Sequence, residues 1–217
     1  MRAGDLISAI MKTRVLLVRH GTTVFSAEDR FAGSSDIDLS DAGRELARRL
    51  GDRLASTKID AAYCSDMKRT VQTATIIGQP HGLIPTPIAA LREIDHGKWE
   101  GMIHKEVEQK FADEYEVWSG DPYATAPPGG ESGLHVLSRA LPALRKIVVD
   151  HPGQTVLVVS HKATNRLLLC SLLGIDERFY RERLAQDLAC LNVIDFKDPS
   201  RGQVVLLNDT SHYAAPA

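Results

Sequence analysis

Residues 14–23 read RVLLVRHGTT, and this stretch decides the fold. Its first six residues form an apolar, β-branched run between two arginines, which predicts a buried strand. Arg19, His20 and Gly21 follow, so a cation, an imidazole and a flexible turn meet where that strand ends. Open α/β sheets bind ligands at the carboxyl ends of their strands. The stretch therefore predicts a strand that ends in a functional site.

Further strands and helices alternate along the chain. Four more apolar runs have the composition of strands: residues 59–64, 155–160, 190–196 and 203–207. Two sets of aliphatic residues between them recur at helical spacing: Leu46, Leu50 and Leu54, and then Leu134, Leu137, Leu141, Leu144 and Val148. Ser40, Ser65 and Ser132 are placed to cap helix starts, and Gly174 to end a helix. The alternation predicts a three-layer α/β/α sandwich with a mostly parallel central sheet.

The composition is that of one globular domain. The chain has 217 residues, 43% of them hydrophobic, which is enough for one core and too few for two comfortable domains. We expect a single domain over residues 1–217. Residues 1–10 precede Met11 and the basic lead into the first strand, so they are either a native extension or a product of start-codon choice.

Charge and cysteine content exclude several classes of protein. The formal net charge is -2, which gives no overall attraction to nucleic acid or to an anionic membrane, so any anion site must be local. The three cysteines contain no CxxC pair and are odd in number, so neither a disulfide framework nor a zinc knuckle is indicated. No export signal, membrane span or anchor is expected. A cytoplasmic location fits these features best.

Two later segments repeat the pattern of a reactive side chain at a strand end. Arg69 follows the second predicted strand within the first turns of a helix, and guanidinium binds phosphate oxygens in bidentate fashion. His161 follows the strand at 155–160 and precedes a helix, whose free N–H groups favour an anion. Taken singly, each has an ordinary structural explanation. Together with His20 they place three such groups at the ends of three strands.

At this point the sequence resembles branch 1 of the histidine phosphatase superfamily, the phosphoglycerate-mutase-like proteins. Six blocks carry the resemblance in the family order: LLVRHGTT (16–23), FAGSSDIDLSDAGRELA (31–47), YCSDMKRTVQTA (63–74), LREIDHGKWEG (91–101), PPGGES (127–132) and VVSHKATNRLLL (158–169). The RHG triplet alone would be a weak signal. The combination is specific and spans most of the chain.

The resemblance implies a role for each matching residue. His20 matches the nucleophile, Arg19 and Arg69 the phosphate clamp, His161 the second histidine, and Glu93 the proton donor. These roles suit phosphoryl transfer, which needs an in-line nucleophile and dense positive charge around the equatorial oxygens. A neutral imidazole can attack, and a carboxylic acid held protonated beside a phosphate dianion can protonate the leaving alkoxide. No metal and no cofactor are required.

Residues on the substrate side follow from the same resemblance. Thr23, His96 and Lys162 join Arg19, Arg69 and His161 as candidate substrate-binding residues. His96 lies in EIDHGKWEG, which is similar to metal-independent bacterial phosphoserine phosphatases, and could hold the amino-acid part of such a substrate or simply bond to backbone. Lys162 replaces a usual glycine and either contacts an anionic substrate or points to solvent. Thr22 and Ser26 also depart from the family pattern, which leaves substrate identity open.

The implied activity is hydrolysis of a small phosphomonoester through a phosphohistidine. His161 follows Glu93 by 68 positions, which is short for the insertion that mutases of this superfamily carry there, so water should reach the phosphohistidine. Phosphoserine or a similar small carboxylate phosphate is the best substrate candidate. A cofactor-dependent phosphoglycerate mutase and an α-ribazole or sugar phosphate phosphatase remain alternatives. Relatives often pair as dimers, so a homodimer is one alternative, but the sequence does not determine the oligomeric state.

Two functions of other classes are disfavoured by the sequence. The segment DIDLS at 36–40 superficially matches the DxDx motif of magnesium-dependent aspartyl phosphatases, but it follows Gly-Ser-Ser and not an apolar strand. A binding protein that kept the fold and lost catalysis is disfavoured because His20, Arg69, Glu93 and His161 are all present.

Overall fold

The computed structural model describes residues 12–28 and 30–214. Within them six strands form one sheet in the order β3-β2-β4-β1-β5-β6. The strands are β1 (Thr13–Arg19), β2 (Ala61–Cys64), β3 (Thr86–Pro87), β4 (Thr155–Ser160), β5 (Leu191–Asp198) and β6 (Arg201–Asp209). β1 to β4 are mutually parallel, whereas β5 runs antiparallel to both β1 and β6. The mostly parallel sheet expected from the sequence is confirmed. The possible extension at residues 1–10 lies outside the described residues.

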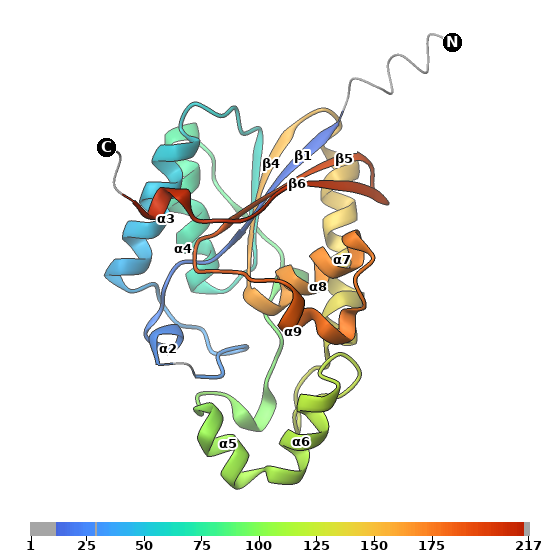
Figure 1. Ribbon diagram of the computed structural model, residues 1–217. Coiled ribbons are helices and arrows are strands. Elements are labelled where there is room, and N and C mark those ends of the chain that lie inside the picture. Colours follow the sequence, from blue (N-terminus) through green and yellow to red (C-terminus); the bar gives the residue numbers. More distant parts are fainter. Residues whose placement is uncertain (1–11, 29, 215–217) are drawn as a thin grey trace.

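Helices cover both faces of this sheet (Figure 1). They are α2 (Val24–Ala27), α3 (Asp41–Leu54), α4 (Lys68–Gly78), α5 (His104–Lys110), α6 (Ala112–Gly120), α7 (Gly133–Asp150), α8 (Lys162–Leu173) and α9 (Tyr180–Arg183). In Figure 1, α3 and α4 lie on one face and α7 and α8 on the other, while α5 and α6 form a pair beyond the lower end of the sheet. The result is the predicted three-layer α/β/α sandwich.

The two-residue period of β1 divides the core between these layers. Val15 and Leu17 belong to the hydrophobic cluster under α7 and α8, and Leu16 and Val18 to the cluster under α3 and α4. All four are at most 2% exposed. A strand covered on both faces must be apolar at every position, which is why RVLLVR has no polar alternation. β1 is therefore the central strand, and its carboxyl end is rigidly placed.

A third, smaller cluster packs the α5–α6 pair against the body of the protein. It comprises Phe31, Trp99, Val107 and Trp118. Trp99 and Trp118 meet edge to face, with ring centroids 5.2 Å apart, an arrangement that aromatic rings favour. The packing fixes α6 close to the carboxyl edge of the sheet, where it forms part of one wall of the site described below.

Most predicted boundaries are confirmed, and the differences have physical causes. Ser40 and Ser132 cap α3 and α7, and Gly174 ends α8 in the left-handed conformation. Ser65 does not cap the next helix, because α4 begins only at Lys68, whose N–H donates to Asp36 Oδ1 at 2.7 Å. A side chain from another loop thus replaces the local cap.

The predicted apolar face of α7 needs one correction. Leu137, Leu144 and Val148 are buried as expected, but Leu134 is 49% exposed. It lies in the first turn of the helix and is not part of the core cluster that the rest of the helix covers. No helix within residues 12–28 and 30–214 is long and apolar enough to cross a membrane.

The turn after β1 passes so close to α3 that it requires glycine. A Cβ on Gly43 would lie 2.2 Å from the carbonyl oxygen of Thr22, and one on Gly21 would lie 2.5 Å from the Gly43 carbonyl oxygen. Both distances are far inside van der Waals contact, so neither position tolerates a side chain without a backbone shift. The close approach fixes the turn that carries His20.

Gly43→Ala is therefore expected to lower the free energy of unfolding by about 1–3 kcal/mol, through overpacking against the turn. Gly51→Ala is the matched control in the same helix, because a Cβ there would meet its nearest atom at an ordinary 3.5 Å. That control should raise stability by about 0.5–1 kcal/mol, the usual gain of alanine over glycine inside a helix. Urea unfolding followed by circular dichroism measures both, and equal effects would contradict the packing argument.

Candidate active site

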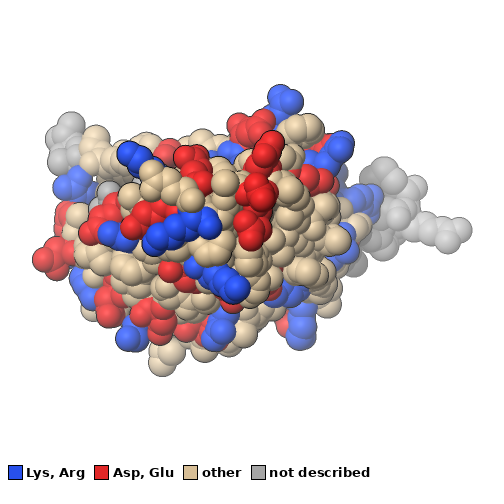
Figure 2. All heavy atoms as spheres, turned by 90° about the horizontal axis from the view of Figure 1, so that it is seen from below, with Lys and Arg blue, Asp and Glu red and all other residues tan. Residues whose placement is uncertain are grey.

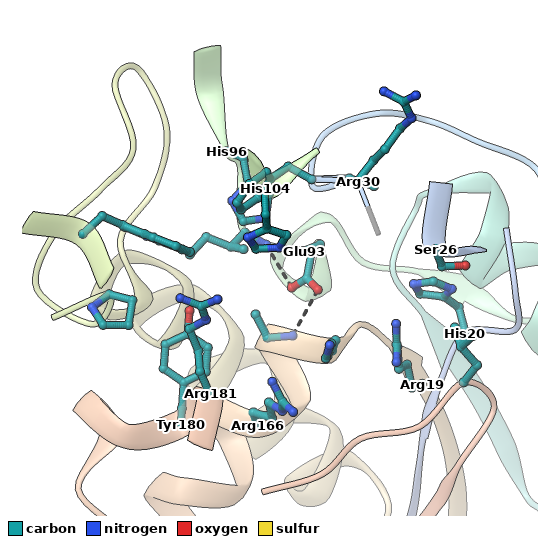
Figure 3. Close-up of a pocket in the computed structure, with 18 of the residues that line it drawn as sticks. Arg19, His20, Ser26, Arg30, Glu93, His96, His104, Arg166, Tyr180 and Arg181 are labelled. Carbon is teal, nitrogen blue, oxygen red and sulfur yellow. Dashed lines mark hydrogen bonds between the residues drawn. The ribbon is translucent and has the colours of Figure 1, made fainter. Parts of the chain in front are cut away.

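A cavity of about 640 Å³ opens at the carboxyl edge of the parallel strands. Residues from β1, α4, α8 and α9, from the segment around Glu93 and from the α5–α6 pair line it. Figure 3 shows these side chains converging from separate parts of the chain, with Glu93 between His20 on one side and Arg166 and Arg181 on the other. The convergence predicted from the strand ends is thus present.

His20 is held in one tautomer. Its Nδ1 lies 2.7 Å from the carbonyl oxygen of Gly21. Because a carbonyl only accepts, Nδ1 carries the proton and Nε2 keeps its lone pair. Burial lowers the pKa of His20 well below its usual 6.5, and the charges of Arg69 and Arg19 lower it further. The imidazole is therefore neutral at physiological pH, as a nucleophile must be.

His161 has the opposite tautomer. Its Nδ1 accepts a hydrogen bond from Arg69 Nε at 3.3 Å, so the proton lies on Nε2. This Nε2 is buried without a hydrogen-bond partner among the described residues. Burial, followed by the charge of Arg69, lowers the pKa of His161 well below 6.5. The ring centroids of His20 and His161 are 5.2 Å apart, so the two rings are neighbours, although His161 is fully buried and does not itself line the cavity.

The guanidinium of Arg69 is 1% exposed and is held by main-chain carbonyls. It donates to the carbonyl oxygens of Ser35 at 2.7 Å and Gly33 at 2.9 Å, in addition to His161. Burial lowers its pKa. Part of the five-donor fork is thus used within the protein. Its positive charge and remaining N–H groups are what it offers to a ligand.

Arg19 is held by the segment before β5. Its Nη1 donates to the Gln186 carbonyl oxygen at 2.7 Å, and its Nε is buried with no partner among the described residues. Burial lowers the pKa of Arg19, and the charge of Arg166 lowers it further. Gln186 is in turn bonded to the buried Asn192 at 2.8 Å. This hydrogen bond could not be predicted from the sequence, because every residue has a main-chain carbonyl and its residue type does not show which one will accept.

Glu93 is positioned by the N-terminus of α8. Its carboxylate accepts from the N–H of Ala163 at 3.0 Å and from the N–H and hydroxyl of Thr164, both at 3.2 Å. The first N–H groups of a helix have no partner within the helix, so they are available to a carboxylate. Figure 3 shows the carboxylate directed into the cavity. From this position the Glu93 carboxyl group can contact an ester bound in the cavity.

The three remaining predicted substrate residues all line the cavity. Thr23 is buried and uses its hydroxyl to cap α2, accepting from Ser26 N–H at 3.2 Å. His96 meets Phe31 edge to face with centroids 4.8 Å apart, and its buried Nδ1 has no partner among the described residues. Burial lowers the pKa of His96. Lys162 is exposed at the cavity rim.

Three further residues were not predicted from sequence: Arg166, Tyr180 and Arg181. Arg166 follows His161 by five positions within a block that the family resemblance already contained. Tyr180 and Arg181 belong to α9, a single short turn without any recognisable motif. That turn lies at the site because β5 runs antiparallel to β1, so the segment before β5 passes the carboxyl edge of the parallel strands. This is a tertiary effect that no local sequence pattern could have revealed.

The DIDLS segment lies outside this site. Asp36 accepts from Lys68 N–H at 2.7 Å and Asp38 from Gln72 Nε2 at 2.5 Å, so both carboxylates serve the start of α4. Neither lines the cavity. Within the described ranges no group of three or more His, Cys, Asp or Glu side chains is arranged to hold a metal ion. The three cysteines are buried, and burial raises their pKa values.

Comparison with known proteins agrees with this geometry. The model of the histidine phosphatase superfamily, branch 1, matches residues 15–210. The chain belongs to this superfamily. Phosphoserine phosphatase 1 of Hydrogenobacter thermophilus is 34% identical over 200 residues, which cover 92% of this chain and 93% of that protein. Glucosyl-3-phosphoglycerate phosphatase of Mycolicibacterium vanbaalenii is 33% identical over 75% of each chain. Such relatives support a phosphatase.

Solved structures confirm the phosphoglycerate-mutase-like fold. Bacillus stearothermophilus YhfR superposes on this histidine phosphatase with a TM-score of 0.86 and 31% identity, over 93% of this chain and 100% of that one. The α-ribazole phosphatase of Shigella flexneri gives a TM-score of 0.82 and 27% identity, over 91% and 96%. The chain covers only 55% of the length of three mycobacterial relatives that are 33% identical to it.

The buried histidines are expected to make stability depend on pH. Below pH 6.5 the two histidines are protonated in the unfolded chain. In the folded protein His20 and His161 remain neutral to lower pH, because burial lowers both pKa values. Stability is therefore complete above about pH 7 and is lost as the pH falls below 6.5, by up to about 1.4 kcal/mol per pH unit for each histidine.

Urea unfolding between about pH 7.5 and about pH 5 measures this slope, above the range in which most carboxylates titrate. His161→Gln removes one contributor and should flatten the slope, whatever its effect on absolute stability. An unchanged slope would contradict the assignment of a neutral His161.

Proposed function

We propose that this histidine phosphatase hydrolyses a small phosphomonoester through a phosphohistidine at His20, without a metal ion. One observation carries the proposal: the neutral imidazole of His20 lines a cavity together with Arg19, Arg69 and Glu93, and the ring of His161, whose Nε2 has no partner among the described residues, lies directly behind it at 5.2 Å. These groups supply what phosphoryl transfer needs, namely a nucleophile, equatorial positive charge and a proton donor.

In the first half of the reaction, the phosphoryl oxygens bind between Arg19, Arg69 and His161. His20 Nε2 attacks phosphorus and forms an N–P bond as the bond to the ester oxygen breaks. Glu93 gives its proton to that oxygen, and the alcohol leaves. The arginines and the His161 N–H balance the charge that spreads over the equatorial oxygens in the transition state.

In the second half, water attacks the phosphohistidine. The Glu93 carboxylate takes a proton from the water as the new O–P bond forms and the N–P bond breaks. Inorganic phosphate leaves, and both His20 and Glu93 return to their starting states. Fixed guanidinium and imidazole groups perform the charge stabilisation for which other phosphatases use a divalent cation.

Hydrolysis rather than mutase chemistry is favoured by the segment between Glu93 and His161. Its only helices within the described residues before α7 are the short pair α5 and α6 and the turn η3 (Gly97–Trp99). The pair forms one wall of the cavity through His104, Trp118 and Ser119. We propose that this wall leaves room for water to reach the phosphohistidine, so that hydrolysis outcompetes transfer to a second hydroxyl.

A small metabolite is a better substrate than a nucleic acid or a membrane lipid. Figure 2 shows basic and acidic residues interspersed on the face seen from below, with no broad basic field. Phosphoserine or a similar small carboxylate phosphate is the proposed substrate class, supported by the similarity to a protein named phosphoserine phosphatase and by the unused Nδ1 of His96 in the cavity. Glucosyl-3-phosphoglycerate and α-ribazole phosphate are second candidates, because similar proteins are named for these substrates.

His20→Ala is expected to lower turnover of p-nitrophenyl phosphate by roughly a thousandfold or more, since no other group can form the intermediate. The wild-type enzyme, quenched during turnover, should carry an acid-labile, base-stable phosphoryl group, and turnover should survive excess EDTA. His81→Ala is the control, because His81 lies outside the cavity. Near-wild-type rates in the His20 variant would remove His20 from the role of nucleophile.

Glu93→Gln tests the proton donor through the leaving group. Turnover of alkyl phosphates, whose alkoxides need protonation, should fall by roughly 10²- to 10⁴-fold, whereas p-nitrophenyl phosphate should be slowed far less. Glu182→Gln changes an exposed carboxylate of the same cavity and serves as the control. Equal slowing of both kinds of ester would exclude Glu93 as the donor.

A further inference from the structure

The cavity has a cationic end that the proposed reaction does not use. Six arginines and one lysine line the cavity against two glutamates, although the chain as a whole has a formal charge of -2. Arg19 and Arg69 belong to the phosphoryl site. Figure 3 places Arg166, Tyr180 and Arg181 on the far side of Glu93 from His20. A substrate whose phosphoryl group lies at His20 would extend its other end in this direction.

Arg166 is not an ordinary surface arginine. It projects from α8, one turn after the residues that hold Glu93, and it is only partly exposed. Its Nε is buried with no hydrogen-bond partner, and no carboxylate lies within ion-pair distance of it in the described part of the chain. Burial lowers the pKa of Arg166, Tyr180 and Glu93 raise it, and the charge of Arg181 lowers it by less. A half-buried guanidinium whose Nε–H has no acceptor costs free energy that a bound anion would recover.

Arg181 approaches the same space from α9. Its guanidinium stacks on the Trp118 ring, 4.3 Å from the centroid, which holds it in place without neutralising it. The preceding residue, Tyr180, is 2% exposed and anchors the short helix. Arg178 on the same cavity wall differs, because Asp176 already pairs with it at 2.6 Å. At this end of the cavity, Arg166 and Arg181 thus differ from Arg178, because neither makes an ion pair among the described residues.

We propose that Arg166 and Arg181 form a second anion site, which binds a carboxylate or second phosphate of the substrate while its phosphoryl group lies at His20. The inference rests on the proposed function and deepens it, because it limits the preferred substrates to phosphomonoesters that carry a second negative group. Guanidinium recognises both kinds of anion in bidentate fashion. The like charges of the two arginines and of Arg19 favour a substrate with a second anionic group over one whose phosphoryl group is its only anion.

Matched substrates test the proposal on the whole protein. Phosphoserine is compared with phosphoethanolamine, and 3-phosphoglycerate with glycerol 3-phosphate, so that each pair differs by a carboxylate. Fructose 1,6-bisphosphate against fructose 6-phosphate tests a second phosphate. Wild-type enzyme should prefer the more anionic member of at least one pair by about tenfold or more in kcat/KM, the selectivity expected when a site built for a polar group is left empty.

Arg166→Gln and Arg181→Gln should each lower kcat/KM for the preferred member by roughly ten- to a hundredfold, the usual worth of a charge-assisted hydrogen bond. The ratio of the kcat/KM values of the two substrates in a pair should fall toward one. A general loss of folded enzyme would leave this ratio unchanged. The two residues lie on different helices, so a defect in one variant does not compromise the other. Arg183→Gln is the control, because Arg183 is on α9 but exposed and outside the cavity.

The outcomes separate the two proposals. A wild-type enzyme that hydrolyses p-nitrophenyl phosphate but shows no preference in any pair overturns the second anion site and leaves the phosphatase intact. A preference that survives both substitutions likewise overturns the assignment to Arg166 and Arg181. Absence of turnover with every phosphomonoester overturns the proposed function, and the second site with it.

Discussion

The site depends on a guanidinium that is buried without a carboxylate. Arg69 is almost completely enclosed, and carbonyl groups of residues 33 and 35 and the ring of His161 take its hydrogen bonds. Carbonyls satisfy the N–H groups but leave the net charge in place. That charge helps keep His20 and His161 neutral, orients the His161 ring and creates the demand for an anion that a phosphate ester meets. Pairing with an acid would have stabilised the arginine and removed the field.

Sheet order brings the reactive groups together. β1 and β4 are adjacent and parallel, and Arg19 is in register with Ser160, so the residues that follow each strand must emerge side by side. The backbone N–H of His20 donates to the Ser160 carbonyl oxygen at 3.0 Å, which joins the two strand ends directly. Two histidines that are far apart in sequence thus become neighbours through strand pairing alone.

The sequence predicted features whose cause is local. The uninterrupted apolar run of β1, the serine cap of α3 and the reactive residues just after β1 and β4 each follow from residue type and spacing. Features created by tertiary contact could not be predicted in this way. The cap of α4 comes from Asp36 in another loop, Arg19 is fixed by a main-chain carbonyl, and Arg181 reaches the cavity on a four-residue helix. Leu134 has the spacing of a core residue but lies in the first turn of α7 and is exposed.

The reversed direction of β5 separates chemistry from recognition. Because β5 runs against β1, its first residues lie at the carboxyl edge of the parallel strands, where Ala189 N–H donates to the His20 carbonyl oxygen at 3.1 Å. The segment that leads into β5, including α9, therefore borders the cavity, and Tyr180 and Leu184 anchor it to the core cluster under α7 and α8. The α5–α6 pair has a similar peripheral position. Residues 186–189 hold Arg19 and His20 and must therefore be kept, but exposed side chains of α9 and of the α5–α6 pair can be exchanged to accept a different metabolite while the groups around His20 remain untouched.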